Sequence, residues 1–247
     1  MKTSNKIVIL IAATLVAANV IYDIAIKREY ATGNYKRPFA DFASLPYQNF
    51  NKIMINPASM ITVKLVQGPF KVLVRNTVKD VLAIKQIDHS LVIDLNWRNA
   101  RYNSGRDIAV LISCPVLKSV KAGATYTLNK VKYTDTIAVD DWSDHHLLVE
   151  GFKQDSLNLV QEWGSKVVLQ NNVLAYFHAN TGNNKESSPK LTIQRNNILN
   201  HADFEINDKS RLILSEARIK TVNYHLADSA SLTVNGAATR SINKQIP

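Results

Sequence analysis

Apolar and polar residues alternate in short runs along most of the chain after residue 50. The alternation is clearest in FNKIMIN (50–56), MITVKLVQG (60–68), FKVLVRN (70–76) and SLVIDLNW (90–97). A period of two is typical of β-strands, whose successive side chains point to opposite faces of a sheet. No stretch of 47–247 keeps a helical period, and helix is expected there as a minority at most, around VKDVLAIKQ. The pattern therefore predicts an all-β domain.

The second half of the chain repeats a Leu-x-apolar unit at a nearly constant spacing. The units are the pairs Tyr126/Leu128, Leu147/Val149, Val167/Leu169, Leu191/Ile193, Leu212/Leu214 and Leu232/Val234. Their first residues lie 21, 20, 24, 21 and 20 residues apart. A second apolar pair follows in five repeats: Ile137/Val139, Leu157/Leu159, Leu174/Tyr176, Phe204/Ile206 and Val222/Tyr224.

A unit of ~20 residues with two short strands cannot bury its own apolar face, whereas stacked copies bury it against each other. We therefore expect a parallel β-solenoid, or β-helix-like, domain in which Leu191, Leu212 and Leu232 lie in one column. Gly151, Asn171 and Gly236 follow three of the units, and these residue types accept left-handed turns at little cost. The alternative is an antiparallel sandwich, whose strands recur every ~8–12 residues.

The N-terminal segment is apolar enough to span a bilayer. Residues 7–26 contain one charge, Asp23, and a helix of ~20 apolar residues crosses the hydrocarbon core. We expect an N-terminal transmembrane helix that anchors the protein, with the membrane as the partner of residues 7–26. The predicted organisation is a membrane anchor or signal segment (1–30), a linker (31–46) and the β-solenoid domain (47–247).

A cleaved signal peptide would explain the same segment. Lys2 and Lys6 precede the apolar run, and Val16 and Ala18 fit a cleavage site. On both interpretations the β domain is exported.

Charge and cysteine content narrow the function further. The net charge of +10 comes from scattered bases without a basic run, so no nucleic-acid partner is expected. Cys114 is the single cysteine, which leaves the exported chain without an internal disulfide. Because Cys114 lies in the apolar run IAVLISCPVL, we expect a buried, inert thiol.

Several segments together resemble the GIN domain, a bacterial envelope family of unknown function that is named as the head domain of autotransporter adhesins. The similar segments are FNKIMINPASMITVKLVQGPFKVLV, SLVIDL, PVLKSVKAGATYTL and the closing DSASLTVNGAA. The resemblance covers about 47–240, although the turns hold fewer glycines than is usual in that family. It implies a right-handed β-solenoid-like domain in the bacterial cell envelope, in the periplasm or at the cell surface. It implies no ligand and no catalytic residue.

Two groups of residues are candidates for binding. The segment VDDWSDHHLLVEG contains Asp140, Asp141, Asp144 and His145, whose oxygens and nitrogens could hold a divalent metal; a solvated acidic turn is the other interpretation. Adjacent histidines on a strand point to opposite faces, which speaks against a shared ion. We expect no cofactor.

The second group combines aromatic and amide side chains. Trp142 and Trp163 are 21 residues apart, about one repeat, and could align on one edge to stack on sugars or to pack the core. The longest repeat contains the polar segment HANTGNNKESSPK, in which Asn180, Asn183 and Asn184 are candidate binding residues or part of a tolerated insertion.

The predicted function is a non-catalytic recognition or structural module of the envelope, adhesin-like and tethered to the membrane, with an envelope glycan or a protein as ligand. The alternative is a carbohydrate-active β-helix enzyme that acts on an envelope or extracellular polysaccharide. Such an enzyme needs clustered acids along one groove. Here Glu150 is followed one and two repeats later by Gln170 and Gln194, and the chain is therefore expected not to be an enzyme.

Overall fold

The computed structural model describes residues 3–33, 39–97, 107–138 and 144–242, which fall into two compact units, 1–41 and 42–247. The first unit contains helix α1 (Thr3–Thr32), whose segment Asn5–Thr32 includes an 18-residue stretch with a mean hydropathy of 2.3, and this stretch is nowhere buried. At about 1.5 Å per residue this segment is longer than the ~30 Å hydrocarbon core of a bilayer. By length and composition α1 could therefore cross a membrane, although a signal sequence would meet the same criteria.

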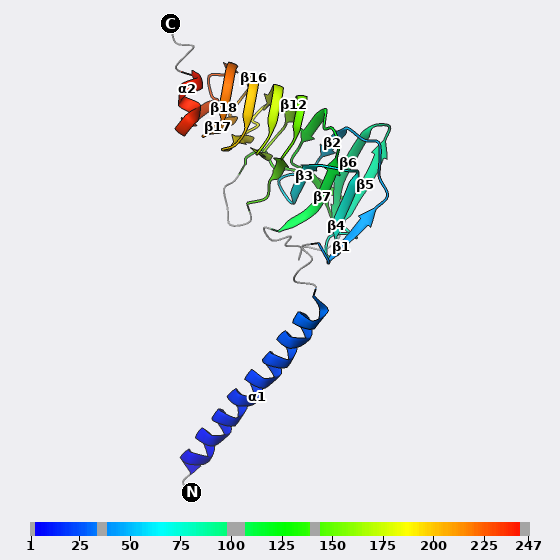
Figure 1. Cartoon of the computed structure of the whole chain (residues 1–247), viewed down its shortest axis with the longest axis vertical. Coiled ribbons are helices and arrows are strands. Elements are labelled where there is room, and N and C mark those ends of the chain that lie inside the picture. Colours follow the sequence, from blue (N-terminus) through cyan, green and yellow to red (C-terminus); the bar gives the residue numbers. More distant parts are fainter. Residues whose placement is uncertain (1–2, 34–38, 98–106, 139–143, 243–247) are drawn as a thin grey trace. The chain divides into compact units, whose positions relative to one another are not determined.

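The second unit consists mostly of strands in two sheets (Figure 1). Across the first sheet the order is β1 (Phe42–Leu45), β4 (Lys71–Arg75), β7 (Ile108–Cys114), β3 (Thr62–Gln67), β11 (Leu147–Glu150), β13 (Lys166–Gln170), β15 (Lys190–Ile193), β17 (Arg211–Ser215) and β19 (Ser231–Asn235). Strand β1 lies within the predicted linker 31–46 and pairs with β4.

The second sheet lies over the same core. Its order is β10 (Val131–Thr134), β9 (Thr125–Leu128), β6 (Ser90–Trp97), β2 (Lys52–Ile55), β8 (Ser119–Ala122), β12 (Lys153–Gln161), β14 (Val173–Thr181), β16 (Ile198–Ile206) and β18 (Arg218–Leu226). Strand β5 (Leu82–Ile87) pairs with β6. A 3₁₀ turn, η2 (Gly236–Ala238), and helix α2 (Thr239–Ile242) follow the last strand.

From β11 onward, consecutive strands belong alternately to the two sheets. The odd-numbered strands pair in parallel in the first sheet, and the even-numbered strands pair in parallel in the second. In the first sheet Leu191 pairs with Leu212, and Leu212 pairs with Leu232, so the predicted column exists. Leu147 and Val167 extend the same column toward the N-terminal half.

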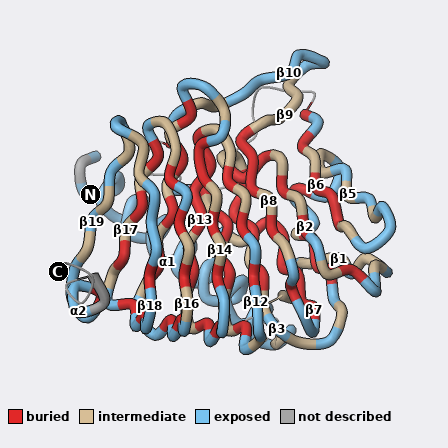
Figure 2. The backbone as a smooth tube through the Cα atoms, turned by 90° about the horizontal axis from the view of Figure 1, so that it is seen from above, coloured by how far each residue is buried: buried red, intermediate tan, exposed pale blue. Residues whose placement is uncertain are grey.

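The inward side chains of the second sheet fill the core from the other side. Phe177 pairs with Ala202, and in the neighbouring column Ala179 pairs with Phe204, so that between β14 and β16 each phenylalanine lies beside an alanine. The two phenylalanine rings meet edge to face with their centroids 5.9 Å apart. Buried and exposed positions alternate along these strands (Figure 2), and the inward residues of both sheets form one continuous buried cluster.

The second apolar pair of the third repeat was placed wrongly. Leu174/Tyr176 does not continue the column of Leu157 and Leu159; Phe177 and Ala179 do. Tyr176 instead points outward and is 39% exposed.

The N-terminal half departs from a wholly parallel coil, so the sheets are mixed. Four strand pairs are antiparallel: β1/β4, β4/β7, β5/β6 and β9/β10. The prediction that Tyr126/Leu128 forms the first unit of the column is wrong, because the neighbour of β11 in that column is β3. The reason lies in the turn: Asn129 and Lys130 both have positive φ, and two such residues make the tight hairpin turn that pairs β9 with β10.

The expected helical minority around residues 78–86 is a turn followed by a strand in the structure. Its second half is β5, which runs antiparallel to β6 and joins it through Asp88, at φ 51°. Apolar spacing alone could not separate the two structures in so short a segment.

One left-handed residue recurs after each strand of the first sheet from β11 to β19. Gly151, Asn171 and Gly236, which were predicted for this role, have φ of 79°, 59° and 60°. Asn196 and Glu216 adopt φ of 65° and 56° at the two remaining positions. The turn geometry therefore repeats even where the residue type does not favour it.

Two buried asparagines follow these turns and join adjacent rungs. The Asn197 amide donates to the backbone oxygens of Leu169 and Gln194, while its own oxygen accepts from the backbone and side chain of Asn172. Asn172 in turn accepts from the backbone N–H of Phe152. Each side chain thus completes hydrogen bonds that the corner leaves open, and neither is exposed to solvent.

We predict that Asn197→Leu lowers the free energy of unfolding by about 3 kcal/mol, because it leaves buried backbone groups without partners. The exposed Asn158 provides the control, and Asn158→Leu is expected to change stability by less than about 0.5 kcal/mol. Urea unfolding followed by tryptophan fluorescence measures both variants. Equal losses of stability for the two variants would show that the hydrogen bonds of Asn197 contribute no more than an exposed amide does.

Cys114 ends β7 and is fully buried, as expected. Burial raises the pKa of the Cys114 thiol to about 12, so almost none of it is thiolate at neutral pH. We predict that 5,5′-dithiobis(2-nitrobenzoate) labels the native protein at least ~100-fold more slowly than the urea-unfolded protein at pH 8. Comparable rates would place the thiol at the surface.

Candidate functional site

A short segment before β11 lies across the corners of the coil. We call Asp135–Ala138 the strap. Its backbone oxygens accept from Gly164 and Ser188, over 2.6 and 2.8 Å, and Ala138 donates back to Ser188 over 3.0 Å. A Cβ on Gly164 would come within 2.5 Å of the strap backbone. Glycine is therefore needed where the strap crosses the turn before β13.

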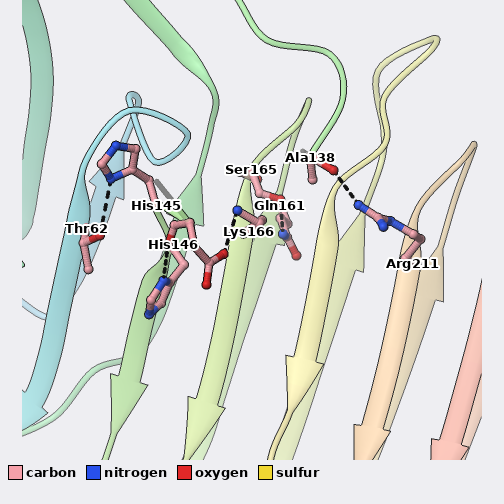
Figure 3. Close-up of polar contacts among 9 residues, drawn as sticks. Thr62, Ala138, His145, His146, Gln161, Ser165, Lys166 and Arg211 are labelled. Carbon is pink, nitrogen blue, oxygen red and sulfur yellow. Dashed lines mark hydrogen bonds and ion pairs between the residues drawn. The ribbon is translucent and has the colours of Figure 1, made fainter. Parts of the chain in front are cut away.

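Three basic residues form a row beneath the strap. Lys166, Lys190 and Arg211 are the first residues of β13, β15 and β17 and lie side by side in register. Arg211 donates from Nη2 to the backbone oxygen of Ala138 (Figure 3). The amide of the fully buried Gln161 donates to the oxygens of Ser165 and Lys190, which holds the entries of β13 and β15 together. The corner is thus built from buried polar groups.

The candidate metal residues divide between different partners. Lys166, only 6% exposed, donates to the Asp144 carboxylate over 2.8 Å. The buried His145 instead places Nδ1 3.5 Å from the Thr62 hydroxyl (Figure 3). Asp140 and Asp141 lie outside the described residues. Within the described parts of the chain, no three His, Cys, Asp or Glu side chains are arranged to hold a metal ion.

A hollow of about 350 Å³ opens beside this corner on the outer face of the first sheet. It is lined by Asp144, His146, Lys166, Val167, Val168, Gln170, Lys190, Thr192, Gln194 and Ile213. We call it the outer-face hollow. The row of Val168, Thr192 and Ile213 is paired in register across β13, β15 and β17. Gln170 ends β13, and Gln194 follows β15 and donates its backbone N–H to Leu169, so the backbones that carry these two carboxamides lie about one strand spacing, ~4.8 Å, apart.

The outer-face hollow offers donors and acceptors over a partly apolar floor. Its described carboxylate, Asp144, is paired with Lys166, so it has no pair of carboxylates for general acid–base chemistry. Carboxamides, a threonine hydroxyl and the His146 ring suit hydrogen bonding to a polar ligand that lies along the sheet. The arrangement therefore favours binding of a polar ligand over acid–base catalysis.

The candidate aromatic and amide residues lie in turns and strand ends of successive rungs. Trp163 occupies the turn after β12 at φ 56°, and its backbone oxygen accepts from the Ser187 hydroxyl over 3.1 Å. The Asn207 amide donates to Asn180 and Asn183 over 3.2 and 3.0 Å. The long repeat is thus tied to the rung on each side.

The two remaining candidate residues are Asn184 and Trp142. Asn184 accepts from the Ser187 backbone within the same turn. Trp142 lies outside the described residues, so its alignment with Trp163 stays a prediction.

Sequence reasoning missed the basic row and the carboxamides. Lys166, Lys190 and Arg211 each precede the first apolar residue of a repeat by one position. The repeat alignment therefore places the three basic residues at one equivalent position, although the apolar pattern by itself indicates only the buried positions.

No family model and no curated protein matches the chain. Solved structures that the chain matches include a "putative adhesin" from Bacteroides fragilis, at 10% identity and a TM-score of 0.39, covering 78% of this chain and 96% of that one. A "putative adhesin" from Parabacteroides merdae matches at 10% identity and 0.39, covering 79% and 95%. One from Parabacteroides distasonis matches at 12% and 0.29, covering 79% and 94%. Similarity at this level assigns neither a family nor a ligand.

We predict that the buried Lys166 and the exposed Asp144 are coupled by about 1 kcal/mol in a double-mutant cycle of Lys166→Met and Asp144→Asn, because one partner is shielded from water. The control pair Arg195–Glu216 is 3.8 Å apart with both side chains more than half exposed, and its coupling should stay below about 0.5 kcal/mol. Urea unfolding measures both cycles. A coupling at Lys166 no larger than the control would contradict the stabilising role of the pair.

Proposed function

We propose that the β-rich unit is a non-catalytic, adhesin-like recognition module of the bacterial cell envelope. The observation that carries the proposal is the outer-face hollow. There Gln170 at the end of β13 and Gln194 after β15 form one row, and Val168, Thr192 and Ile213 form a second row across β13, β15 and β17. Regularly spaced polar groups match an extended ligand with a repeating backbone, such as a glycan or a strand of protein. A single reacting centre would not require such repetition.

We further propose that β11–β19 are successive turns of a β-solenoid of the GIN type. The alternation of strands between two parallel ladders and the recurring left-handed turns support this proposal. The resemblance of PVLKSVKAGATYTL and DSASLTVNGAA to that domain is its basis in the sequence.

We propose that residues 7–26 anchor the protein in the membrane and that the β-rich unit is exported to the periplasm or the cell surface. The length and apolar character of α1 support the anchor. A tether of this kind keeps the recognition module close to its own membrane while leaving its outer faces accessible to envelope components.

A carbohydrate-active enzyme is the weaker alternative. Hydrolysis of a glycosidic bond usually needs two carboxylates across the substrate. At the outer-face hollow the described carboxylate of Asp144 is committed to Lys166, and Glu150 is bound by Lys64 and Asn171. These contacts favour binding over turnover.

The test is a binding screen with the full chain in lipid nanodiscs against purified peptidoglycan, bacterial polysaccharides, collagen and fibronectin. Gln170→Ala/Gln194→Ala should weaken binding of whichever component is retained by about 30-fold, since each of the two lost hydrogen bonds contributes ~1 kcal/mol. The control Gln48→Ala/Asn96→Ala removes exposed amides elsewhere and should bind like wild type.

A second arm with Trp163→Ala tests the proposed binding edge that also includes Asn180, Asn183, Asn184 and Trp142. If no component binds, the recognition proposal is wrong. If a component binds and the Gln170/Gln194 variant retains full affinity, the outer-face hollow is not its site.

A further inference from the structure

The outer face of the second sheet carries an array of polar and aromatic side chains that the outer-face hollow does not include. Strands β14, β16 and β18 run parallel and in register there. Tyr176 lies beside His201, and in the adjacent column His178 lies beside Asp203, which lies beside Asn223. We call these five residues the tyrosine–aspartate array.

Two rings of the array form a flat aromatic surface. The Tyr176 ring stacks on the His201 imidazole with centroids 5.2 Å apart and planes 13° from parallel. Tyr176 remains 39% exposed, so part of its ring is open to solvent. Stacking across two strands holds the rings in place before any ligand arrives.

The Asp203 carboxylate lies at the edge of this surface and is surrounded by donors. It accepts from the Tyr176 hydroxyl and from Asn223 over 2.9 Å, and its Oδ1 lies 3.2 Å from His201 Nε2. The hydrogen bond from Tyr176 lowers the pKa of Asp203 most, and Asn223, His201 and His178 act in the same direction. The same hydrogen bond raises the pKa of Tyr176. At neutral pH the hydroxyl therefore donates and the carboxylate accepts.

These contacts are too exposed to be explained by stability alone. Ion pairs and hydrogen bonds at a solvent-exposed surface contribute little to folding, because water competes for the same groups. The array nevertheless fixes an aromatic face, a carboxylate and a carboxamide in one orientation. Fixing polar groups in advance lowers the entropic cost of binding a ligand.

We infer that the tyrosine–aspartate array binds one neutral pyranose unit of an envelope or extracellular glycan. The apolar C–H face of the sugar packs on the exposed part of the Tyr176 ring. Two neighbouring hydroxyls donate to the remaining lone pairs of Asp203 and accept from the array's donors. Within the described residues no metal-binding group of three His, Cys, Asp or Glu forms here, so the sugar is bound directly and without a bridging cation.

This site is separate from the outer-face hollow, which lies on the other sheet. The inference goes beyond the proposed function, because it names a second surface and a class of ligand for it. It stands if the hollow binds nothing.

The test uses saturation-transfer difference NMR on the full chain in nanodiscs, with EDTA present throughout. The probes are the methyl glycosides of glucose, galactose, mannose and N-acetylglucosamine. At least one of them should bind with a Kd of about 1 mM, the order expected for a ligand of this size at an exposed site.

Tyr176→Ala should weaken that binding at least ~10-fold, because it removes the stacking surface and the donor to Asp203. Asp203→Asn keeps the shape of the side chain and should also weaken binding by about 10-fold. Tyr176→Phe keeps the ring and should lose only about 2- to 5-fold. Thermal unfolding checks that each variant is folded.

The chain offers a matched control in another pair of stacked rings, formed by Tyr126 and Tyr133. Tyr126 and Tyr133 stack with centroids 5.8 Å apart, and Tyr126 donates to Asp135. Tyr133→Ala and the Gln48→Ala/Asn96→Ala variant should bind the glycosides like wild type.

Two results would overturn the inference. The first is that none of the four glycosides shows saturation transfer up to about 20 mM, well above the expected Kd. The second is that a glycoside binds but folded Tyr176→Ala and Asp203→Asn retain wild-type affinity. The second result would place the sugar elsewhere on the protein.

Discussion

The structure depends on backbone hydrogen bonds between parallel strands that lie in register one rung apart. Because the register is kept from β11 to β19, residues at equivalent positions stack into columns both inside and outside the sheets. The inner columns form the core from Leu, Val, Ile and Phe. The outer columns form the polar surfaces that we interpret as binding sites. One constraint on the backbone thus produces both the stability and the candidate function.

The buried column could be predicted from the sequence because it requires only that apolar residues recur at a nearly constant separation along the chain. The constant number of residues between Leu191, Leu212 and Leu232 predicts that they are neighbours, whatever structure the intervening residues adopt. The N-terminal half could not be predicted in this way. There the turn at Asn129 and Lys130 reverses the chain, and strands distant in sequence, β3 and β11, become neighbours. A spacing rule has no information on such pairings, which depend on turn geometry and on contacts formed only in the folded chain.

The candidate site was predictable in composition but not in geometry. The acidic segment around Asp144 and His145 was identified, yet its two described residues point to different partners, Lys166 and Thr62. Lys166 is a distant residue that only the strand register brings close. The tyrosine–aspartate array could not be predicted either, because its residues are also brought together by strand register. The position of Tyr176 in the repeat predicts a core residue. A local irregularity in β14 instead turns its side chain outward, beside His201.

The alternation of Phe177 with Ala202 and of Ala179 with Phe204 constrains how this coil could have lengthened during evolution. A duplicated β14 rung would place one phenylalanine on another in one column and leave two alanines facing each other in the next. Crowding on one side and a void on the other both cost stability in a close-packed interior. Growth by whole pairs of rungs keeps the volumes complementary. A lineage with this core should therefore change length in steps of two turns, or repair the mismatch with a compensating substitution.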